Sequence, residues 1–286
     1  MPHPIVRPPL RRNRVLAALA GGIAVAVGAG LLLSHAAATD PSGNTAPEVV
    51  PPTANAAFDY QIGGAYTPPA GVGAVSRDRG ALPAEGLYNV CYVNAFQAQP
   101  DALGRWEKDD ADLLLRDADG DPVMDEDWGE ALLDTSTAGK RARLAKIVGD
   151  WIDGCAKSGF QGVEPDNLDS YERSGGLLTP ADNAAFAKLL ADRAHAAGLA
   201  IGQKNTTDLL GQRTEIGFDF AVAEECGRYD ECADYASAYD DKVFVVEYTA
   251  GDFEKACSSV GAKVSVVRRD LGVVAAGRPG HVFRAC

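Results

Sequence analysis

Three carboxylates and an amide lie within six residues in the segment Glu164-Pro165-Asp166-Asn167-Leu168-Asp169. The mostly apolar run 160–163 directly before it predicts a strand, so these polar side chains would lie at the carboxyl end of that strand. A β/α-barrel enzyme holds its catalytic acids and nucleophiles at such strand ends. Proline, aspartate and asparagine are also common turn residues, and the segment by itself favours a turn.

Acidic residues also follow other apolar runs of the chain: Glu224, Glu225, Glu247 and Asp270. Strand ends of a barrel converge on one face, so acids distant in sequence become neighbours there. Two carboxylates suffice to cleave a glycosidic bond, one protonated as general acid and one ionised to attack the anomeric carbon or activate water. Each acid alone is more often a solvated loop residue, but recurrence after four apolar runs indicates a site. Tyr92 and Tyr248, near the same ends, could stack on sugar rings.

The elements that would position these residues alternate between strands and helices. Eight apolar runs predict strands: 58–62, 72–75, 87–93, 159–163, 199–201, 218–223, 243–246 and 264–267. Helical spacing of apolar residues predicts helices at 138–158 and 180–197, the second with Thr179 as N-cap, and shorter ones at 207–213, 230–239 and 252–259. Such alternation implies a parallel sheet, and eight strands in one domain favour a single (β/α)8 TIM-type barrel.

Two stretches depart from a regular barrel. The segment 62–72 has no room for a crossover helix, so the first unit is expected to be degenerate. The stretch 106–137, which contains Trp106 and Trp128, is expected to be an insertion after the third strand.

The N-terminal part of the chain carries an export signal. Four arginines precede an apolar or small run at 15–33, and a small-residue cleavage site follows within residues 34–38. Residues 1–38 are therefore a signal peptide or, because the run is long enough to span a bilayer, a retained membrane anchor. Residues 39–56 are expected to be a linker and 57–286 the barrel domain. Either alternative predicts a secreted or extracytoplasmic, membrane-anchored protein.

The charge and the cysteine content limit which classes of partner and which cellular compartment are expected. The formal net charge is −13, and it becomes −17 without residues 1–38, which hold four arginines and no acidic residue. This acidity excludes a nucleic-acid footprint and would suit a soluble exported protein or a cationic substrate. Six cysteines in an exported chain predict disulfides, and six allow 15 pairings. The short spacing favours Cys226–Cys232 as the first pair.

Several other chemistries lack their motifs. Only His195 and His281 follow the export segment, and the chain has no H-E-x-x-H, G-x-S-x-G or G-x-x-x-x-G-K-[ST] sequence. A histidine-rich zinc centre, an esterase and a nucleotide site therefore lose their usual support, and we expect no metal and no cofactor.

A set of segments, in strand order over residues 57–270, resembles glycoside hydrolase family 114, the endo-α-1,4-polygalactosaminidase-like β/α barrels. These segments are Tyr60-Gln61-Ile62-Gly63, Cys91-Tyr92, residues 162–169, Gly202-Gln203-Lys204-Asn205, residues 218–226 with Glu231-Cys232, and Glu247-Tyr248. The resemblance implies exported hydrolysis of galactosamine-containing α-1,4 polysaccharide by a pair of acids. Ser76-Arg77-Asp78 departs from it, because an acidic pair is expected there.

The resemblance assigns the first acid to Asp166 and the second to Glu224. Glu225 is the adjacent rival, because only one of two consecutive residues can point inward from a strand end. The remaining candidates would bind substrate: Asn167, Asp169, Lys204, Asn205, Glu225, Glu247, Tyr248 and Tyr92. The leading hypothesis is an endo-acting glycosidase with Asp166 as nucleophile and Glu224 as acid/base in a retaining mechanism. An inverting mechanism stays open, and so does a non-catalytic, polysaccharide-binding barrel at the cell surface.

Overall fold

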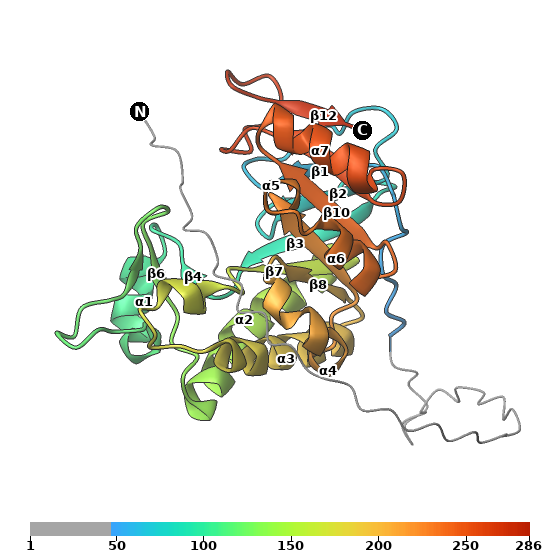
Figure 1. Ribbon diagram of the computed structural model, residues 1–286. Helices are drawn as coiled ribbons and strands as arrows, with labels where there is room; N and C mark the ends of the chain where they lie inside the picture. The colour runs from blue at the N-terminus through green and yellow to red at the C-terminus, as the bar shows by residue number, and fades with distance from the viewer. Residues whose placement is uncertain (1–46) are drawn as a thin grey trace, which may run out of the picture. The chain divides into compact units, whose positions relative to one another are not determined.

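Eight parallel strands form the core of the molecule, one at each position that the sequence predicts (Figure 1). The computed structural model describes residues 47–286. In sheet order the parallel strands are β1 Phe58–Gln61, β2 Ala74–Asp78, β3 Tyr88–Asn94, β7 Gly162–Asp166, β8 Ala200–Lys204, β9 Phe220–Glu224, β10 Val243–Glu247 and β11 Ser265–Arg269. A ninth strand, β12 (Phe283–Ala285), pairs antiparallel with β11. Arg269 of β11 forms an ion pair with Asp59 of β1, so the sheet curls into a nearly closed barrel. The predicted fold class is confirmed.

Side chains alternate between the inside and the outside of this barrel because successive residues of a strand point to opposite faces. Phe58, Val90, Phe220 and Phe244 fill the inside, and the rings of Phe58 and Phe244 stack with centroids 4.2 Å apart. The same alternation directs every second residue at the carboxyl ends towards the barrel axis.

Helices cover the outer face of the later strands. The two long ones are α2 (Ala138–Ser158), which Gly159 ends in a left-handed conformation, and α3 (Pro180–Ala196). Thr179 and Asp182 form a capping box at the start of α3, as the sequence predicts. The shorter helices are η2 (Ser170–Arg173), η3 (Thr207–Gln212), α4 (Arg213–Ile216), α5 (Cys226–Tyr229), α6 (Cys232–Ala238) and α7 (Ala250–Val260).

The first two barrel units lack a helix, whereas only the first was expected to be degenerate. Loops follow β1 and β2 directly, and a buried polar network covers the outer face of these strands. Arg77 Nε donates to Gln61 Oε1 (2.9 Å), Gln61 Nε2 donates to Asp59 Oδ2 (2.8 Å), and Asp59 pairs with Arg269. Arg77, expected to replace an acid of the site, is therefore part of this outer network.

The predicted insertion after the third strand is a small antiparallel sheet with a helix (Figure 1). It begins at residue 97 rather than 106, and the sheet order is β4-β6-β5. Its elements are β4 (Gln97–Ala98), α1 (Leu103–Asp109), η1 (Ala111–Leu113), β5 (Met124–Asp125) and β6 (Glu130–Leu132).

Three disulfides join all six cysteines: Cys91–Cys155, Cys226–Cys232 and Cys257–Cys286. The predicted Cys226–Cys232 pair is confirmed. Residues 47–56 contact the barrel although they were expected within a linker: Pro52 is buried, and Tyr88 donates its hydroxyl to the Val50 carbonyl.

The predicted export segment and the first part of the linker, residues 1–46, lie outside the described residues. Within residues 47–286, none of the helices has the length and apolar character needed to cross a membrane.

Candidate active site

Lys204 is the centre of a cluster of charged side chains at the carboxyl ends of the strands. Its side chain is 1% exposed, and its Nζ lies 2.8 Å from Glu164 Oε1, 3.2 Å from Asp166 Oδ1 and 3.3 Å from Glu224 Oε2. Burial disfavours the ammonium charge, but the carboxylates of Asp166, Glu164 and Glu224 raise the pKa of Lys204 well above its ordinary value. Lys204 is therefore a protonated counterion shared by three acids.

Asp166, the last residue of β7, has two hydrogen-bond donors and an ion-pair partner. Tyr92 donates its hydroxyl to Oδ2 (2.6 Å), the backbone N–H of Asn167 donates to Oδ1 (2.7 Å), and Lys204 Nζ lies beside Oδ1. Burial and the charge of Asp166 raise the pKa of Tyr92 well above its ordinary value, so Tyr92 remains a donor. These donors stabilise a negative charge on Asp166.

Contacts hold both the side chain and the backbone of Glu224, the last residue of β9. Tyr248 donates its hydroxyl to Oε1, and Lys204 Nζ lies beside Oε2. The backbone N–H of Glu224 donates to Asn205 Oδ1 (2.8 Å), and Asn205 itself has a left-handed backbone. The side chains of Asp166 and Glu224 are 17% and 21% exposed, so a substrate can reach both.

Glu164 lies on the same side of β7 as Asp166 but is fully buried. It accepts hydrogen bonds from Tyr60 (2.8 Å), Ser76 (2.7 Å) and Lys204 (2.8 Å). Burial raises the pKa of Glu164, and the ammonium of Lys204 opposes this shift. We conclude that Glu164 and its partners orient Lys204 rather than contact substrate. Residues two apart along a strand point to the same face, which places Tyr60, Ser76 and Glu164 inside the barrel. This period was the signal that could have identified the residues that orient Lys204.

The structure separates the two rival acids Glu224 and Glu225. Glu225 leaves the strand with a left-handed backbone (φ 57°) and forms an ion pair with Arg228 of α5 at 2.7 Å. Only Glu224 of the two contacts Lys204 among the described residues. Glu225, predicted as a substrate ligand, is therefore not brought into the cluster.

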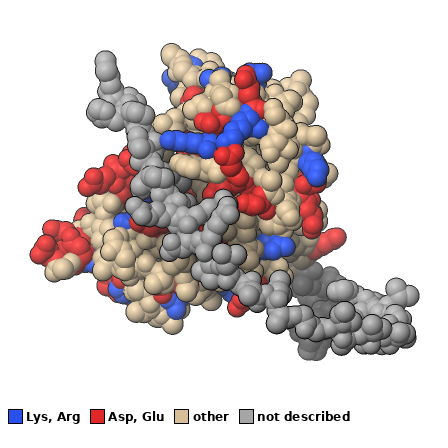
Figure 2. All heavy atoms as spheres, viewed as in Figure 1, with Lys and Arg blue, Asp and Glu red and all other residues tan. Residues whose placement is uncertain are grey.

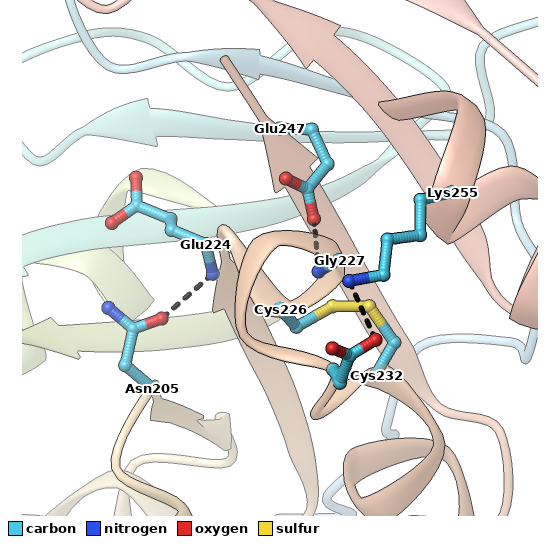
Figure 3. The surroundings of a disulfide bond; sticks show 8 residues. Asn205, Glu224, Cys226, Gly227, Cys232, Glu247 and Lys255 are labelled. Carbon is cyan, nitrogen blue, oxygen red and sulfur yellow. Dashed lines mark hydrogen bonds and ion pairs between the residues drawn. A yellow bond between two sulfur atoms is a disulfide. The ribbon is translucent and has the colours of Figure 1, made fainter. Parts of the chain in front are cut away.

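Glu247 also lies outside the cluster. It is the outward residue at the end of β10, whereas Tyr248, the next residue, points inward to Glu224. In Figure 3 the carboxylate of Glu224 points away from the Cys226–Cys232 disulfide, while that of Glu247 points to Gly227. The Gly227 N–H donates to Glu247 Oε1 (2.6 Å), and burial raises the pKa of Glu247 to about 7.

Asn167 joins the cluster to the insertion. Its Nδ2 donates to Asn94 Oδ1 (3.0 Å), and Asn94 Nδ2 donates to Glu130 Oε2 (2.8 Å). Burial raises the pKa of Glu130, and the charge of Asp166 adds to the effect. The sequence did not identify Glu130, because it lies in the irregular insertion. Asp169, predicted to bind substrate, is buried and pairs with Arg173 at 2.9 Å.

The two accessible acids are close enough to act on one bond. Asp166 Oδ1 and Glu224 Oε2 lie 3.2 and 3.3 Å from the same nitrogen, so these oxygens are at most 6.5 Å apart. Carboxyl pairs about 5–5.5 Å apart are typical of retaining glycosidases, and pairs about 6.5–9.5 Å apart are typical of inverting ones. The arrangement therefore fits two-carboxylate hydrolysis of a glycosidic bond.

Solved structures share this fold. A crystal structure of Aspergillus fumigatus Ega3 in complex with galactosamine has a TM-score of 0.66 and 26% sequence identity, and the match covers 85% of this chain and 100% of that chain. The glycoside hydrolase domain of PelA from Pseudomonas aeruginosa has a TM-score of 0.51 and 16% identity, with 78% and 96% of the two chains covered. At that identity the likeness to PelA shows the fold alone. No curated protein matches the chain in sequence.

One protein-family model matches the whole described barrel and begins before it. The model is that of Glycoside-hydrolase family GH114, and it matches residues 38–286. With the barrel and the paired acids at its carboxyl-end face, this match shows that the chain belongs to glycoside-hydrolase family GH114.

Proposed function

We propose that the protein is an exported, endo-acting glycoside hydrolase that cleaves α-1,4-linked, galactosamine-containing polysaccharide by a retaining mechanism. The observation that carries the proposal is the pair Asp166 and Glu224, joined through Lys204 at the end of the barrel where such enzymes react. The substrate class is supported by Ega3, which is 26% identical and was crystallised with galactosamine.

In the proposed reaction Asp166 is the nucleophile. Its two hydrogen-bond donors and the Lys204 ammonium stabilise the ionised carboxylate, which attacks the anomeric carbon as the glycosidic bond breaks. Glu224 gives its proton to the departing glycosidic oxygen, and then removes a proton from the water that hydrolyses the glycosyl–Asp166 ester. The Tyr248 hydroxyl and Asn205 amide hold Glu224 for both transfers.

Export is supported by the chemistry of the cysteines. All six form disulfides, and such bonds persist in oxidising compartments. Residues 1–38 would then be the signal peptide or anchor, with residues 15–33 as the membrane tether of the anchored form.

The proposal is tested with Asp166→Asn and Glu224→Gln on an α-1,4-linked galactosamine polymer. Each variant should lower kcat on the order of 10³-fold while the circular dichroism spectrum stays unchanged. Glu225→Gln is the matched control and should keep most of the activity, because Glu225 pairs with Arg228. Full activity of Asp166→Asn would exclude it as nucleophile.

The products distinguish the remaining alternatives. An early mixture of intermediate-length fragments would support endo cleavage, and nuclear magnetic resonance should show the α-anomer as the first product of a retaining enzyme. A β-anomer would instead establish inversion. Tight polymer binding without new reducing ends would mean a non-catalytic binding barrel.

A further inference from the structure

The insertion meets the proposed nucleophile through one residue, Asn167. It directly follows Asp166 at the end of β7, and its backbone N–H donates to Asp166 Oδ1 at 2.7 Å. The backbone of Asn167 is left-handed, with a φ of 67°. Asparagine adopts this conformation more readily than most residues, but it persists only where the surrounding structure holds it. The direction of this N–H towards the carboxylate therefore depends on what holds Asn167.

The protein holds the Asn167 side chain at both of its polar atoms. Its Nδ2 donates to Asn94 Oδ1 (3.0 Å) and to Glu130 Oε2 (3.4 Å). Its Oδ1 accepts from Arg173 at 3.3 Å. Asn94 in turn donates its own Nδ2 to the same oxygen of Glu130 (2.8 Å). A chain of hydrogen bonds thus runs from Glu130 of the insertion through Asn94 to Asn167 and ends at Arg173.

The two charged ends give this chain one direction. An ionised carboxylate only accepts hydrogen bonds, and a guanidinium only donates them. Glu130 therefore turns the NH2 group of Asn94 towards itself, which leaves the Asn94 carbonyl oxygen to accept from Asn167. Arg173 turns the carbonyl oxygen of Asn167 towards itself. Flipping either amide would bring two donors or two acceptors together, so both side chains are fixed.

Both ends of the chain depend on the β5–β6 hairpin of the insertion. Asp125 of β5 lies opposite Glu130 of β6 in this hairpin. Asp125 is buried, and its Oδ2 lies 2.8 Å from Arg173 Nε, while Asp169 pairs with the same guanidinium at 2.9 Å. The hairpin therefore supplies the carboxylate that orients Asn94 and one of the two that hold Arg173.

We propose that Glu130 is a positioning residue for the nucleophile: through Asn94 and Asn167 it fixes the backbone N–H that holds the carboxylate of Asp166 for attack. This inference rests on the proposed function and gives the insertion a part in catalysis. A residue that acts in this way does not touch the substrate. Its loss should therefore slow the chemical step and leave substrate binding unchanged.

The test compares Glu130→Ala, which removes the carboxylate, with Glu130→Gln, which keeps an acceptor at the same length. On an α-1,4-linked galactosamine polymer Glu130→Ala should lower kcat roughly 10- to 100-fold and change KM by less than about twofold, since a small misplacement of a reacting group is costly. Glu130→Gln should recover most of this loss. Glu126→Ala, at an exposed position in the turn of the same hairpin, is the matched control and should behave as wild type.

A double-mutant cycle with Asp166→Asn shows whether Glu130 acts through the nucleophile. In that background Glu130→Ala should lower the residual rate by less than about twofold, because the carboxylate that it positions is already gone. An equal loss in both backgrounds would mean that Glu130 acts by another route, and the inference would fail. A higher KM with unchanged kcat would make Glu130 a substrate ligand and would also overturn it.

Asn167→Gly provides a second variant, and thermal unfolding of each variant shows whether the fold is kept. Glycine accepts the left-handed backbone but has no side chain for Asn94 and Glu130 to hold. It should reproduce the fall in kcat, and it decides the question if Glu130→Ala does not fold. If the wild type cleaves the polymer and both variants keep its kcat, only this inference fails. If the wild type itself cleaves no polymer, the proposed function fails and the inference falls with it.

Discussion

The charge balance of the site depends on the ammonium group of Lys204. Lys204→Met would leave Glu164 fully buried without its counterion, and removing one partner of a buried pair costs about 3–5 kcal/mol. We expect a loss of that size in the free energy of unfolding by urea, together with loss of hydrolysis. Lys188→Met, which breaks an exposed pair with Asp192, should change stability by less than about 0.5 kcal/mol. Equal effects of the two substitutions would contradict this account of Lys204.

Glu247, which lies outside the acid cluster, should make the stability of the fold depend on pH. Its pKa is about 7 in the folded protein because of burial, above the ordinary 4.5, so the folded state binds this proton more tightly than the unfolded chain. Stability from this group is therefore complete below about pH 4.5 and is lost as the pH rises to about 7, by about 3 kcal/mol at most.

Glu247→Gln keeps an acceptor for the Gly227 N–H but cannot ionise. Urea unfolding should show little difference from wild type near pH 5 and a more stable variant near pH 8, by about 2–3 kcal/mol. Glu254→Gln, at an exposed position of α7, should show no such dependence on pH. A constant difference at both pH values would mean that Glu247 does not titrate in this range.

At the scale of elements, two of the disulfides should contribute differently to stability and to catalysis. Cys91–Cys155 links β3 to α2 across 64 positions, whereas Cys226–Cys232 closes a loop of six positions directly after Glu224. Loop-closure entropy predicts a contribution of about 4 kcal/mol for the long link and about 2 kcal/mol for the short one. We therefore expect Cys91→Ala/Cys155→Ala to lower the unfolding temperature more.

The short link should matter more for catalysis. Cys226→Ala/Cys232→Ala frees the segment that follows Glu224, so we expect the larger fall in kcat from this pair. Thermal unfolding and steady-state kinetics of both double variants check this. The same order of the two pairs in both measurements would show that the short disulfide only adds stability.

The strands and long helices could be predicted because their signals are local. Each of the eight parallel strands coincides with an apolar run, and α3 begins at its capping box. The outward direction of Glu247 could not be predicted. Val243 to Val246 of β10 are buried on both faces, so the strand has no apolar–polar alternation from which to read the facing of its last residue.

Neither the structure of the insertion nor its contribution to the site could be predicted from the sequence. Its strands have two or three residues each, too short for a periodic pattern. The approach of Glu130 to Asn94 is a contact between segments 36 positions apart that no local signal encodes. The assignment of Asp166 and Glu224 depended on the resemblance, because four apolar runs end in acids and spacing alone does not select a pair.

At the scale of the whole molecule, the acidic charge should affect encounter with the substrate. The chain has a formal net charge of −13, and on the face shown in Figure 2 acidic side chains are spread over the surface and include a group at the outer end of the insertion. A cationic galactosamine polymer would be attracted over a distance limited by the Debye length, about 10 Å at 0.1 M salt.

We therefore expect kcat/KM on a de-N-acetylated polymer to fall as salt rises from about 0.02 to 0.5 M, by roughly tenfold or more, since steering of this kind is screened. A fully N-acetylated polymer provides the neutral control and should show little change. The same salt dependence for both polymers would exclude a cationic substrate as the reason for the acidity.

The polar network on the outer face of β1 and β2 predicts where the barrel opens locally. Helices pack apolar surface against β7, β8 and β9, but the outer face of β1 and β2 carries Asp59, Gln61 and Arg77 under loops. Lifting these loops exposes little apolar surface to water, whereas Phe58 on the inner face of β1 stays packed on Phe244, so the loops open at a lower free energy than the helices over β7 to β9. We therefore expect amide protons of the loops over β1 and β2 to exchange with deuterium through local fluctuations, and those of β7 to β9 to exchange only when the whole barrel unfolds.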